Sequence, residues 1–217
     1  MTVGFGTIAL KQAGLMDYQA ALEIQRQFHS EVADGKRPNT LILLEHPPVY
    51  TAGRRTEDSD RPIDGSPVIE VDRGGKITFH GPGQLVGYPI VKLAEPIDVL
   101  GFVRQIEDAL IAVCEELSIK GERFPGRSGV WVRDENGDRK IAAIGVRVAR
   151  GVTMHGFAIN VSTNLSYFDR IVPCGIPDAG VTSIEKELGR NVTIDEVCRV
   201  VERHLFEALV KVTDGRP

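Results

Sequence analysis

The sequence is poor in the features that mark membrane, extracellular and nucleic-acid-coating proteins. Its 217 residues include only three cysteines and one tryptophan, and the net charge is −4. No apolar run approaches the roughly 18 to 20 residues that a membrane helix needs, and the first residues lack the order of a cleaved signal peptide. Three cysteines are too few for a disulfide framework, and nucleic-acid-coating domains usually carry a basic excess. We therefore expect a cytoplasmic protein with reduced thiols, no membrane contact and no nucleic-acid partner.

The remaining composition is that of an ordinary folded protein. Hydrophobic residues make up 42% of the chain and charged residues 26%, which are typical globular values. We find no internal repeat, low-complexity tract or linker, and no regular alternation of strands and helices. The sequence therefore predicts one α/β domain over residues 1–217 with a mixed sheet, and we expect a monomer.

Helical spacing and capping residues predict three main helices. Asp17 can cap a helix that ends near Gly35, and residues 98–119 form the clearest helix. Capping boxes begin at Thr182 and Thr193, and the second opens a helix. Cys114 and Cys198 fall within these helices, which favours structural roles for both thiols. The apolar stripe of residues 98–119 consists of Val99, Phe102, Val103, Ile106, Leu110, Val113 and Leu117.

Apolar runs and turn residues predict the strands. Residues 40–45 read as a buried strand, and residues 49–53, 85–93 and 152–161 as further strands. Residues 129–133 and 140–149 form a predicted hairpin, because Asn136-Gly137 is a strong turn signal. Residues 68–72 and 76–79 flank Gly74-Gly75, a plausible tight turn, although these glycines could serve another purpose. Residues 162–180 are irregular and are expected at the surface.

Residues 73–84 are unusually rich in glycine, with four in twelve positions. Glycines allow a ligand to approach the backbone closely, and exposed N–H groups can hold an anionic or carbonyl oxygen. The glycine spacing does not fit a dinucleotide-binding fingerprint, and the segment has no Gly-Lys-Ser/Thr of a phosphate-binding loop. The alternative is a plain hairpin turn in which His80 is a strand histidine with satisfied hydrogen bonds.

Cys174 lies between Pro173 and Pro177, in an irregular segment where a thiol can be rigid and accessible. A cysteine with an ordinary pKa is only about 3% ionised at pH 7, so chemistry at this thiol needs a neighbour that favours thiolate. Lys140 is one candidate, because it starts an otherwise apolar strand in which its stem could be buried. His80 and His155 are the rival partners, and their spacing to Cys174 fits no compact zinc site.

Positive charge is concentrated in residues 120–150, which hold eight basic and four acidic residues within an acidic chain. One interpretation is a solvated strand face, and the other is a docking patch for an acidic partner.

Taken together, these motifs resemble those of the lipoyl(octanoyl) transferase family. The resemblance covers nearly the whole chain, and the order and spacing of the motifs match. The motifs are residues 44–53 (LEHPPVYTAG), 73–84 (RGGKITFHGPGQ), 140–147 (KIAAIGVR), 155–160 (HGFAIN), 173–176 (PCGI) and 181–183 (VTS).

The resemblance implies transfer of an octanoyl group from octanoyl-acyl carrier protein to a lysine of lipoyl domains, in 2-oxoacid dehydrogenase E2 subunits and the glycine cleavage H protein. Cys174 then corresponds to the nucleophile and Lys140 to the lysine that lowers its pKa. The implied fold is a mixed, mostly antiparallel sheet flanked by helices, as in biotin and lipoate ligases, with no metal, nucleotide or other cofactor. The implied acyl-binding residues are Arg73, Gly74, Gly75, Lys76, Ile77, Thr78, Phe79, His80, Ala143, Ile144, Gly145, Gly156, Phe157 and Ala158.

Elementary acid–base chemistry refines the expected role of Lys140. A free lysine is only about 0.04% neutral at pH 7, so Lys140 acts first as an ammonium that favours the Cys174 thiolate and later takes a proton from the incoming amine.

Two other functions stay open. An ATP-dependent lipoate or biotin ligase would share the fold, the glycine-rich strand and the lysine, but would not need Cys174. A non-catalytic protein that only binds lipoyl domains or acyl carriers is the other alternative.

Overall fold

The computed structural model describes residues 8–172 and 179–213, which form two β-sheets and surrounding helices. The order in the eight-stranded sheet is β1 (Ala9–Leu15), β2 (Thr40–Glu45), β6 (Gln84–Ile90), β10 (Val152–Asn160), β9 (Gly137–Ala149), β8 (Arg127–Asp134) and β7 (Glu122–Phe124), with β11 (Gly180–Val181) paired to β9. The β1–β2 and β9–β11 pairs are parallel and the other pairs are antiparallel. The expected mixed, mostly antiparallel sheet is confirmed.

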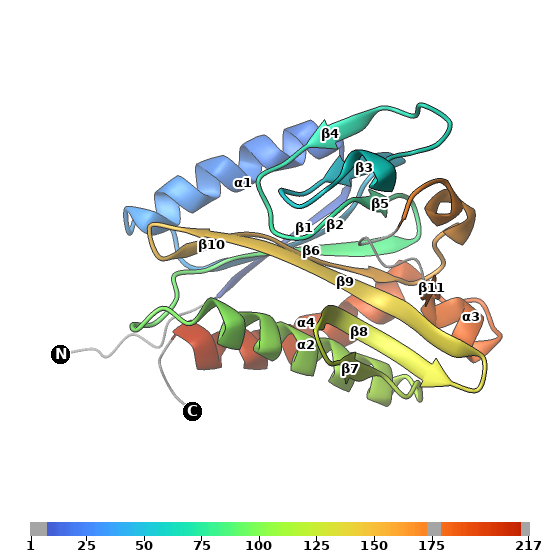
Figure 1. Ribbon diagram of the computed structural model, residues 1–217. Coiled ribbons are helices and arrows are strands. Elements are labelled where there is room, and N and C mark those ends of the chain that lie inside the picture. The colour runs from blue at the N-terminus through green and yellow to red at the C-terminus, as the bar shows by residue number, and fades with distance from the viewer. Residues whose placement is uncertain (1–7, 173–178, 214–217) are drawn as a thin grey trace.

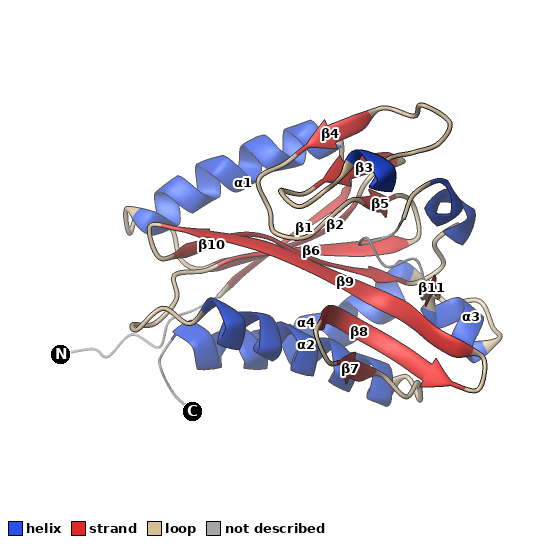
Figure 2. Cartoon of the chain, in the orientation of Figure 1, coloured by secondary structure: helices blue, strands red, loops and turns tan. Residues whose placement is uncertain are grey.

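Helices cover both faces of the large sheet (Figures 1 and 2). Helix α1 (Tyr18–Ala33) lies on one face, and α2 (Val99–Glu116) and α4 (Ile194–Thr213) lie side by side on the other. The short helices are α3 (Ile184–Leu188), η1 (Asp58–Asp60) and η2 (Leu165–Arg170). The last of these lies in the stretch expected to be irregular, and it buries Phe168. None of the described helices combines the length and apolar character that a bilayer crossing requires.

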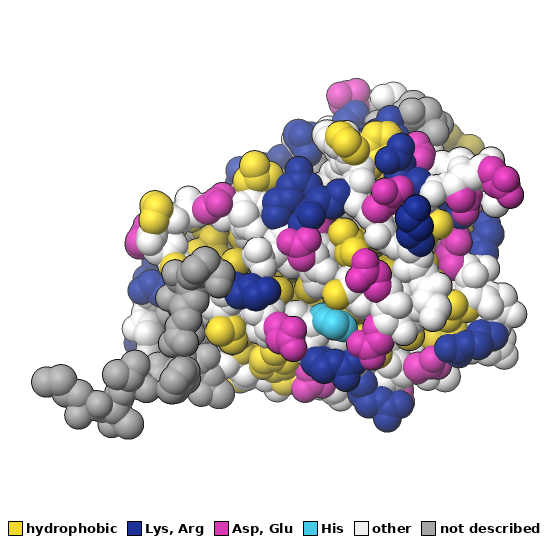
Figure 3. Space-filling view, turned by 90° about the horizontal axis from the view of Figure 1, so that it is seen from below, with side chains coloured by type: hydrophobic (Ala, Val, Ile, Leu, Met, Phe, Trp, Pro, Cys, Tyr) yellow, Lys and Arg dark blue, Asp and Glu magenta, His cyan; other side chains and the backbone are white. Residues whose placement is uncertain are grey.

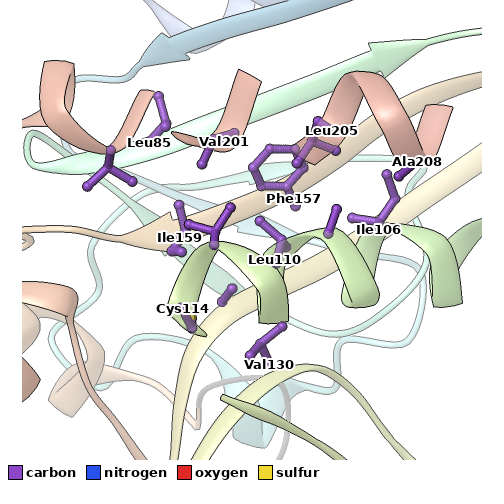
Figure 4. Packing of buried hydrophobic residues seen from close by; sticks show 14 of the residues in the cluster. Leu85, Ile106, Leu110, Cys114, Val130, Phe157, Ile159, Val201, Leu205 and Ala208 are labelled. Atoms are coloured by element: carbon purple, nitrogen blue, oxygen red, sulfur yellow. The ribbon is translucent and has the colours of Figure 1, made fainter. Parts of the chain in front are cut away.

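Burial on both faces explains why residues 40–45 read as one continuous apolar run. Side chains alternate between the two faces of a strand. Leu41 and Leu43 pack in the large core beneath α2 and α4, whereas Ile42 and Leu44 pack with α1. Figure 4 shows the large core, in which Leu110 of α2 lies close to Phe157 of β10.

Capping side chains define where the helices begin. Asp17 accepts hydrogen bonds from the amides of Gln19 and Ala20, and Asp98 accepts one from Gly101, which confirms the predicted starts of α1 and α2. Thr193 caps α4 as expected, through the amide of Glu196.

Two details of the helix predictions are wrong. Ser183, and not Thr182, caps α3, because the Ser183 hydroxyl accepts from the Lys186 amide while the Thr182 hydroxyl donates to Glu187. Val99 was expected in the apolar stripe of α2 but is 42% exposed. It is the first residue of the helix, beyond the stretch that lies against the sheet.

The predicted hairpin around Gly74-Gly75 is also wrong. Strands β4 (Val68–Glu70) and β5 (Thr78–His80) do not pair with each other, because β3 (Val49–Ala52) lies between them in a three-stranded sheet. β3 pairs parallel with β4 and antiparallel with β5. The loop of residues 71–77 therefore crosses over β3.

The predicted hairpin of residues 129–133 and 140–149 is confirmed, and the structure has a second hairpin directly after it. Strands β8 and β9 are joined at Glu135–Asn136, with Gly137 in the left-handed region at φ 95°. Strands β9 and β10 are joined by Arg150 and Gly151, both with positive φ, as a two-residue hairpin turn requires.

Leu110 gives a direct test of the large core. It is fully buried, so Leu110→Ala removes apolar contacts and leaves a cavity. We expect the free energy of unfolding to fall by about 3 kcal/mol in urea titrations. Leu100→Ala in the same helix is the matched control, because Leu100 is 67% exposed and its loss should cost less than about 0.5 kcal/mol. Equal losses would contradict the packing of α2.

Candidate functional site

The glycine-rich loop, β8 and β9 meet at a cavity of about 220 Å³. Five basic side chains contribute to its wall, and its described lining contains no acidic residue. A concave site lined by charge of one sign favours ligands or groups of the opposite sign. The five basic residues are Arg55, Arg73, Lys76, Arg127 and Lys140.

Lys140 lies on β9 with only 7% of its surface exposed, so the buried stem expected from the sequence is confirmed. Its Nζ lies 4.6 Å from the ring centroid of Trp131, the residue directly opposite on β8. Within residues 8–172 and 179–213, Nζ has no hydrogen-bonding or ion-pair partner. An ammonium that opens into a cavity without a counterion can interact with an anion there.

The Arg73 guanidinium holds the glycine-rich loop together. It donates hydrogen bonds to the carbonyls of Thr51, Gly74 and Lys76 and to the Thr51 hydroxyl, at 2.8 to 3.1 Å. The Gly74 amide donates to the Val146 carbonyl of β9. This amide, which we considered for oxygen binding, therefore serves to dock the loop.

Two glycines outside the loop make the docking possible. A Cβ at Gly53 would lie 2.5 Å from the Gly75 carbonyl oxygen, and one at Gly145 would lie 3.0 Å from the Gly74 carbonyl oxygen. A side chain at Gly53 would displace the loop, and one at Gly145 would crowd it. The loop is thus clamped between the end of β3 and the middle of β9.

Two smaller cavities share lining residues with the larger one. One of about 20 Å³ is lined by Lys140, Thr78, Ala143 and Ala158. Another, of about 30 Å³, is lined by residues from all three predicted acyl-binding segments, and Ala143 borders all three cavities. The predicted acyl-binding residues that line the cavity of about 30 Å³ are Arg73, His80, Ala143, Gly145, Gly156, Phe157 and Ala158.

Three of the predicted acyl-binding residues do not line these cavities. Ile77 and Phe79 pack with Tyr50 and Phe168 in a separate core, because alternate residues of β5 face opposite sides and only Thr78 and His80 face the cavities. Gly74 contacts β9 instead. The remaining predicted residues Gly75, Lys76 and Ile144 line the larger cavity.

His80 belongs to a buried hydrogen-bond chain. Its Nδ1 donates to the Gln84 side-chain oxygen at 2.7 Å, because the Gln84 amide nitrogen donates to the Phe79 carbonyl and to Asn160. Burial lowers the pKa of His80 to about 3. His80 is therefore neutral at pH 7, and its side chain matches the satisfied strand histidine considered from the sequence.

His155 is the other candidate histidine, and Asp72 occupies one side of its ring. Nε2 donates to Asp72 at 2.8 Å, and Asp72 also pairs with Arg147. Burial lowers the pKa of His155, although the hydrogen bond to Asp72 opposes this shift. Its Nδ1 is buried without a partner in the described part of the chain. His155 lines the cavity of about 30 Å³.

Comparison with known proteins decides the family. The model of the lipoyl protein ligase A/B catalytic domain matches residues 17–206. The octanoyltransferase of Salinispora arenicola is 58% identical over 207 residues, covering 94% of this chain and 97% of the relative. That of Acidothermus cellulolyticus is 59% identical, covering 97% and 96%. The chain belongs to the lipoyl protein ligase A/B catalytic domain family.

Solved structures support the same fold. A bipartite lipoate protein ligase from Thermoplasma acidophilum aligns with a TM-score of 0.70 at 14% identity, covering 94% of this chain and 84% of that one. Lipoate-protein ligase A bound with ATP aligns with a TM-score of 0.64 at 15% identity, covering 94% and 85%. The expected ligase-like fold is confirmed.

Cys174, the expected nucleophile of this family member, lies outside the described residues, so its pairing with Lys140 stays a prediction. The other two cysteines are buried in α2 and α4. Burial raises the pKa of Cys114 to about 12 and also raises that of Cys198. Neither thiol is suited to act as a nucleophile at neutral pH.

Several site residues were not identified from the sequence. Tyr18 and Tyr88 line the cavity of about 30 Å³, and His46 accepts a hydrogen bond from the Tyr88 hydroxyl at 2.7 Å. Arg55, Arg127 and Trp131 surround Lys140. Of these residues, Trp131 could have been found from the sequence, because the predicted hairpin pairs its strand with the strand of Lys140.

The basic segment of residues 120–150 does not form a continuous patch. Five of its eight basic residues pair with carboxylates, and Lys140 is buried. Figure 3, which shows the side of α2 and α4, displays interspersed acidic and basic side chains. These contacts favour the solvated strand face over the docking patch. The five paired residues are Arg123, Arg133, Arg139, Arg147 and Arg150.

Gly53→Ala tests the clamped loop. The added methyl would overlap the Gly75 carbonyl oxygen, so the loop must shift from its place between β3 and β9. We expect faster hydrogen exchange of the Gly74 amide, whose bond to Val146 is broken. Gly180→Ala is the control, because its nearest neighbour would be 3.6 Å away. Unchanged exchange in Gly53→Ala would contradict the clamp.

His80 predicts a pH dependence of stability. The unfolded chain binds a proton at this histidine below about pH 6.5, whereas the folded chain binds it only near pH 3. Stability should therefore fall as the pH falls from 6.5, by at most about 1.4 kcal/mol per pH unit for this group. His80→Asn removes the titration. Between pH 6 and pH 5, the free energy of unfolding in urea should therefore fall by about 1 kcal/mol less in this variant than in the wild type. Measurement at pH 8 gives the pH-independent cost, and identical slopes would refute the prediction.

Proposed function

We propose that this chain is an octanoyltransferase that carries an octanoyl group from the thioester of an acyl carrier protein to a lipoyl-domain lysine. Relatives that are 58 to 59% identical over nearly their full length bear that name. The observation that carries the proposal is Lys140, a buried ammonium without a counterion in the described part of the chain, which lines two neighbouring cavities. The whole chain acts as one catalytic domain.

In the first step, the Cys174 thiolate attacks the donor carbonyl. The Lys140 ammonium supplies the positive charge that favours thiolate. The bond between the carbonyl carbon and the donor sulfur then breaks, and the donor leaves as a thiolate that takes a proton from Lys140. The products are an octanoyl thioester on Cys174, a free carrier thiol and a neutral Lys140.

In the second step, the ε-amine of the acceptor lysine attacks the Cys174 thioester. The new carbon–nitrogen bond forms, Cys174 leaves as thiolate, and Lys140 takes the proton that the amine loses. The amide product and the original ion pair result.

The acyl chain lies along the wall at Ala143, which borders all three cavities. Each buried methylene contributes roughly 0.8 kcal/mol, so an eight-carbon chain could contribute up to about 5 kcal/mol before ordering costs. The two smaller cavities have room for about one water each. Neither holds an eight-carbon chain, so the walls between the cavities must move to admit it.

The donor is already activated as a thioester, so this reaction needs no ATP, metal or other cofactor. The acceptors we propose are the lipoyl domains of 2-oxoacid dehydrogenase E2 subunits and the glycine cleavage H protein. A fold relative was solved with its E2 lipoyl domain, which supports this class of acceptor.

Intact-mass analysis after incubation with octanoyl-acyl carrier protein tests the proposal. We expect one octanoyl adduct that maps to the peptide containing Cys174. Cys174→Ala should lose both the adduct and the transfer. Cys114→Ala and Cys198→Ala should retain both, because those thiols are buried and their pKa values are raised.

The rival functions give different results in the same assays. A non-catalytic binding protein would show no adduct. An adenylating ligase would keep full activity in Cys174→Ser and would catalyse lipoate-dependent exchange of ATP and pyrophosphate.

A further inference from the structure

Trp131 holds a special position beside Lys140. It is 1% exposed on β8, and its ring centroid lies 4.6 Å from Lys140 Nζ and 6.0 Å from the Arg127 guanidinium carbon. Cations within about 6 Å of an aromatic face are attracted by its electron density, and indole gives the strongest attraction. One ring therefore contacts two of the five cations of the larger cavity.

The backbone beside Trp131 makes room for the stem of Lys140. Gly129, two residues before Trp131 on the same face of β8, has φ +108°, and a Cβ there would lie 3.5 Å from Lys140 Cε. The lysine stem thus passes over Gly129 toward the indole. The Gly129 amide is fixed in turn by the buried carboxylate of Glu107, at 3.0 Å.

Phe124 extends the arrangement away from the cavity. Its ring lies 5.5 Å from that of Trp131, and the guanidinium groups of Arg127 and Arg133 lie 4.4 and 4.5 Å from its centroid. Rings and cations therefore alternate along this edge of the sheet. The aromatic faces offset the repulsion between Lys140 and Arg127, which line the same cavity.

Core packing alone does not account for an indole at this position. Trp131 Nε1 is buried without a hydrogen-bond partner in the described part of the chain. An unpaired buried donor costs about 1 to 3 kcal/mol, and a phenylalanine or leucine would fill a core position without that cost. The feature that distinguishes tryptophan here is its electron-rich face under a cation.

We propose that Trp131 is the positioning residue for Lys140: its indole face holds the ammonium at the mouth of the acyl cavities, where that ammonium favours the Cys174 thiolate. This inference rests on the proposed function of Lys140. Trp131 itself contacts no reacting atom.

Fluorinated tryptophan provides the sharpest test, because Trp131 is the only tryptophan of the chain. Each fluorine withdraws electron density from the ring face with little change of shape. We expect the pH midpoint of iodoacetamide labelling of Cys174 to rise stepwise from mono- to di- to trifluorotryptophan. The kcat for octanoyl transfer should fall roughly two- to threefold per fluorine, with KM changed less than about twofold. An unchanged or lower midpoint would overturn the inference.

Lys140→Ala supplies the control for structural effects of fluorine. In that variant, fluorination should leave the labelling midpoint unchanged, and a shift of the same size as in the wild type would overturn the inference. If Lys140→Ala itself labels and transfers like the wild type, the proposed role of Lys140 fails. If Lys140→Ala loses wild-type labelling and transfer while fluorination of the wild type has no effect, only the role of Trp131 fails.

Substitutions give a second, independent comparison. Trp131→Phe keeps an aromatic face and should lower kcat less than Trp131→Leu does. Trp131→Leu should lower kcat about tenfold and raise the pH midpoint of Cys174 labelling above that of Trp131→Phe. Phe102→Leu is the matched control for lost core volume, because Phe102 is equally buried but lies on α2 in the large core. A folded Trp131→Leu variant that behaves like Phe102→Leu would contradict the proposal.

Discussion

The contact between the glycine-rich loop and β9 determines how the site is built. Gly53 and Gly145 lack side chains where the loop carbonyls approach most closely, and Arg73 bonds the loop to β3. The small sheet is thereby held against the large one. Arg73 lines both the cavity of about 220 Å³ and the cavity of about 30 Å³. The shape of the site therefore depends on how closely the backbones approach as well as on side-chain chemistry.

The environment of each titratable group separates the possible roles of the site residues. Burial holds His80 neutral, and its Nδ1 proton is already donated to Gln84. His155 donates to Asp72. Lys140 differs from both histidines, because its polar end faces a cavity and an aromatic ring instead of a hydrogen-bonding side chain. Among these three candidates, the lysine is therefore the group best placed to pair with an anion that enters the cavity.

The sequence predicted those parts of the fold that depend on local pattern. Asp17 and Thr193 cap helices as expected, and the continuous run of β2 is buried on both faces. The position of β3 between β4 and β5 could not be predicted in this way, because strand order depends on contacts between distant residues. The resemblance on motifs gave the site segments, but only the alternation along β5 reveals that Ile77 and Phe79 face away from the cavities.

The same distinction between local pattern and long-range contact applies to charge. Counting residues showed a basic segment at 120–150, yet most of its arginines are neutralised by carboxylates, several of them distant in sequence. Exposed pairs of this kind contribute little to stability, but they reduce the net field of the surface. Lys140 is different because the neighbour that stabilises its charge is the aromatic ring of Trp131. An aromatic face stabilises an ammonium without supplying a fixed negative charge, so it leaves the cation able to interact with a thiolate in the cavity, whereas a carboxylate in the same place would compete with that thiolate.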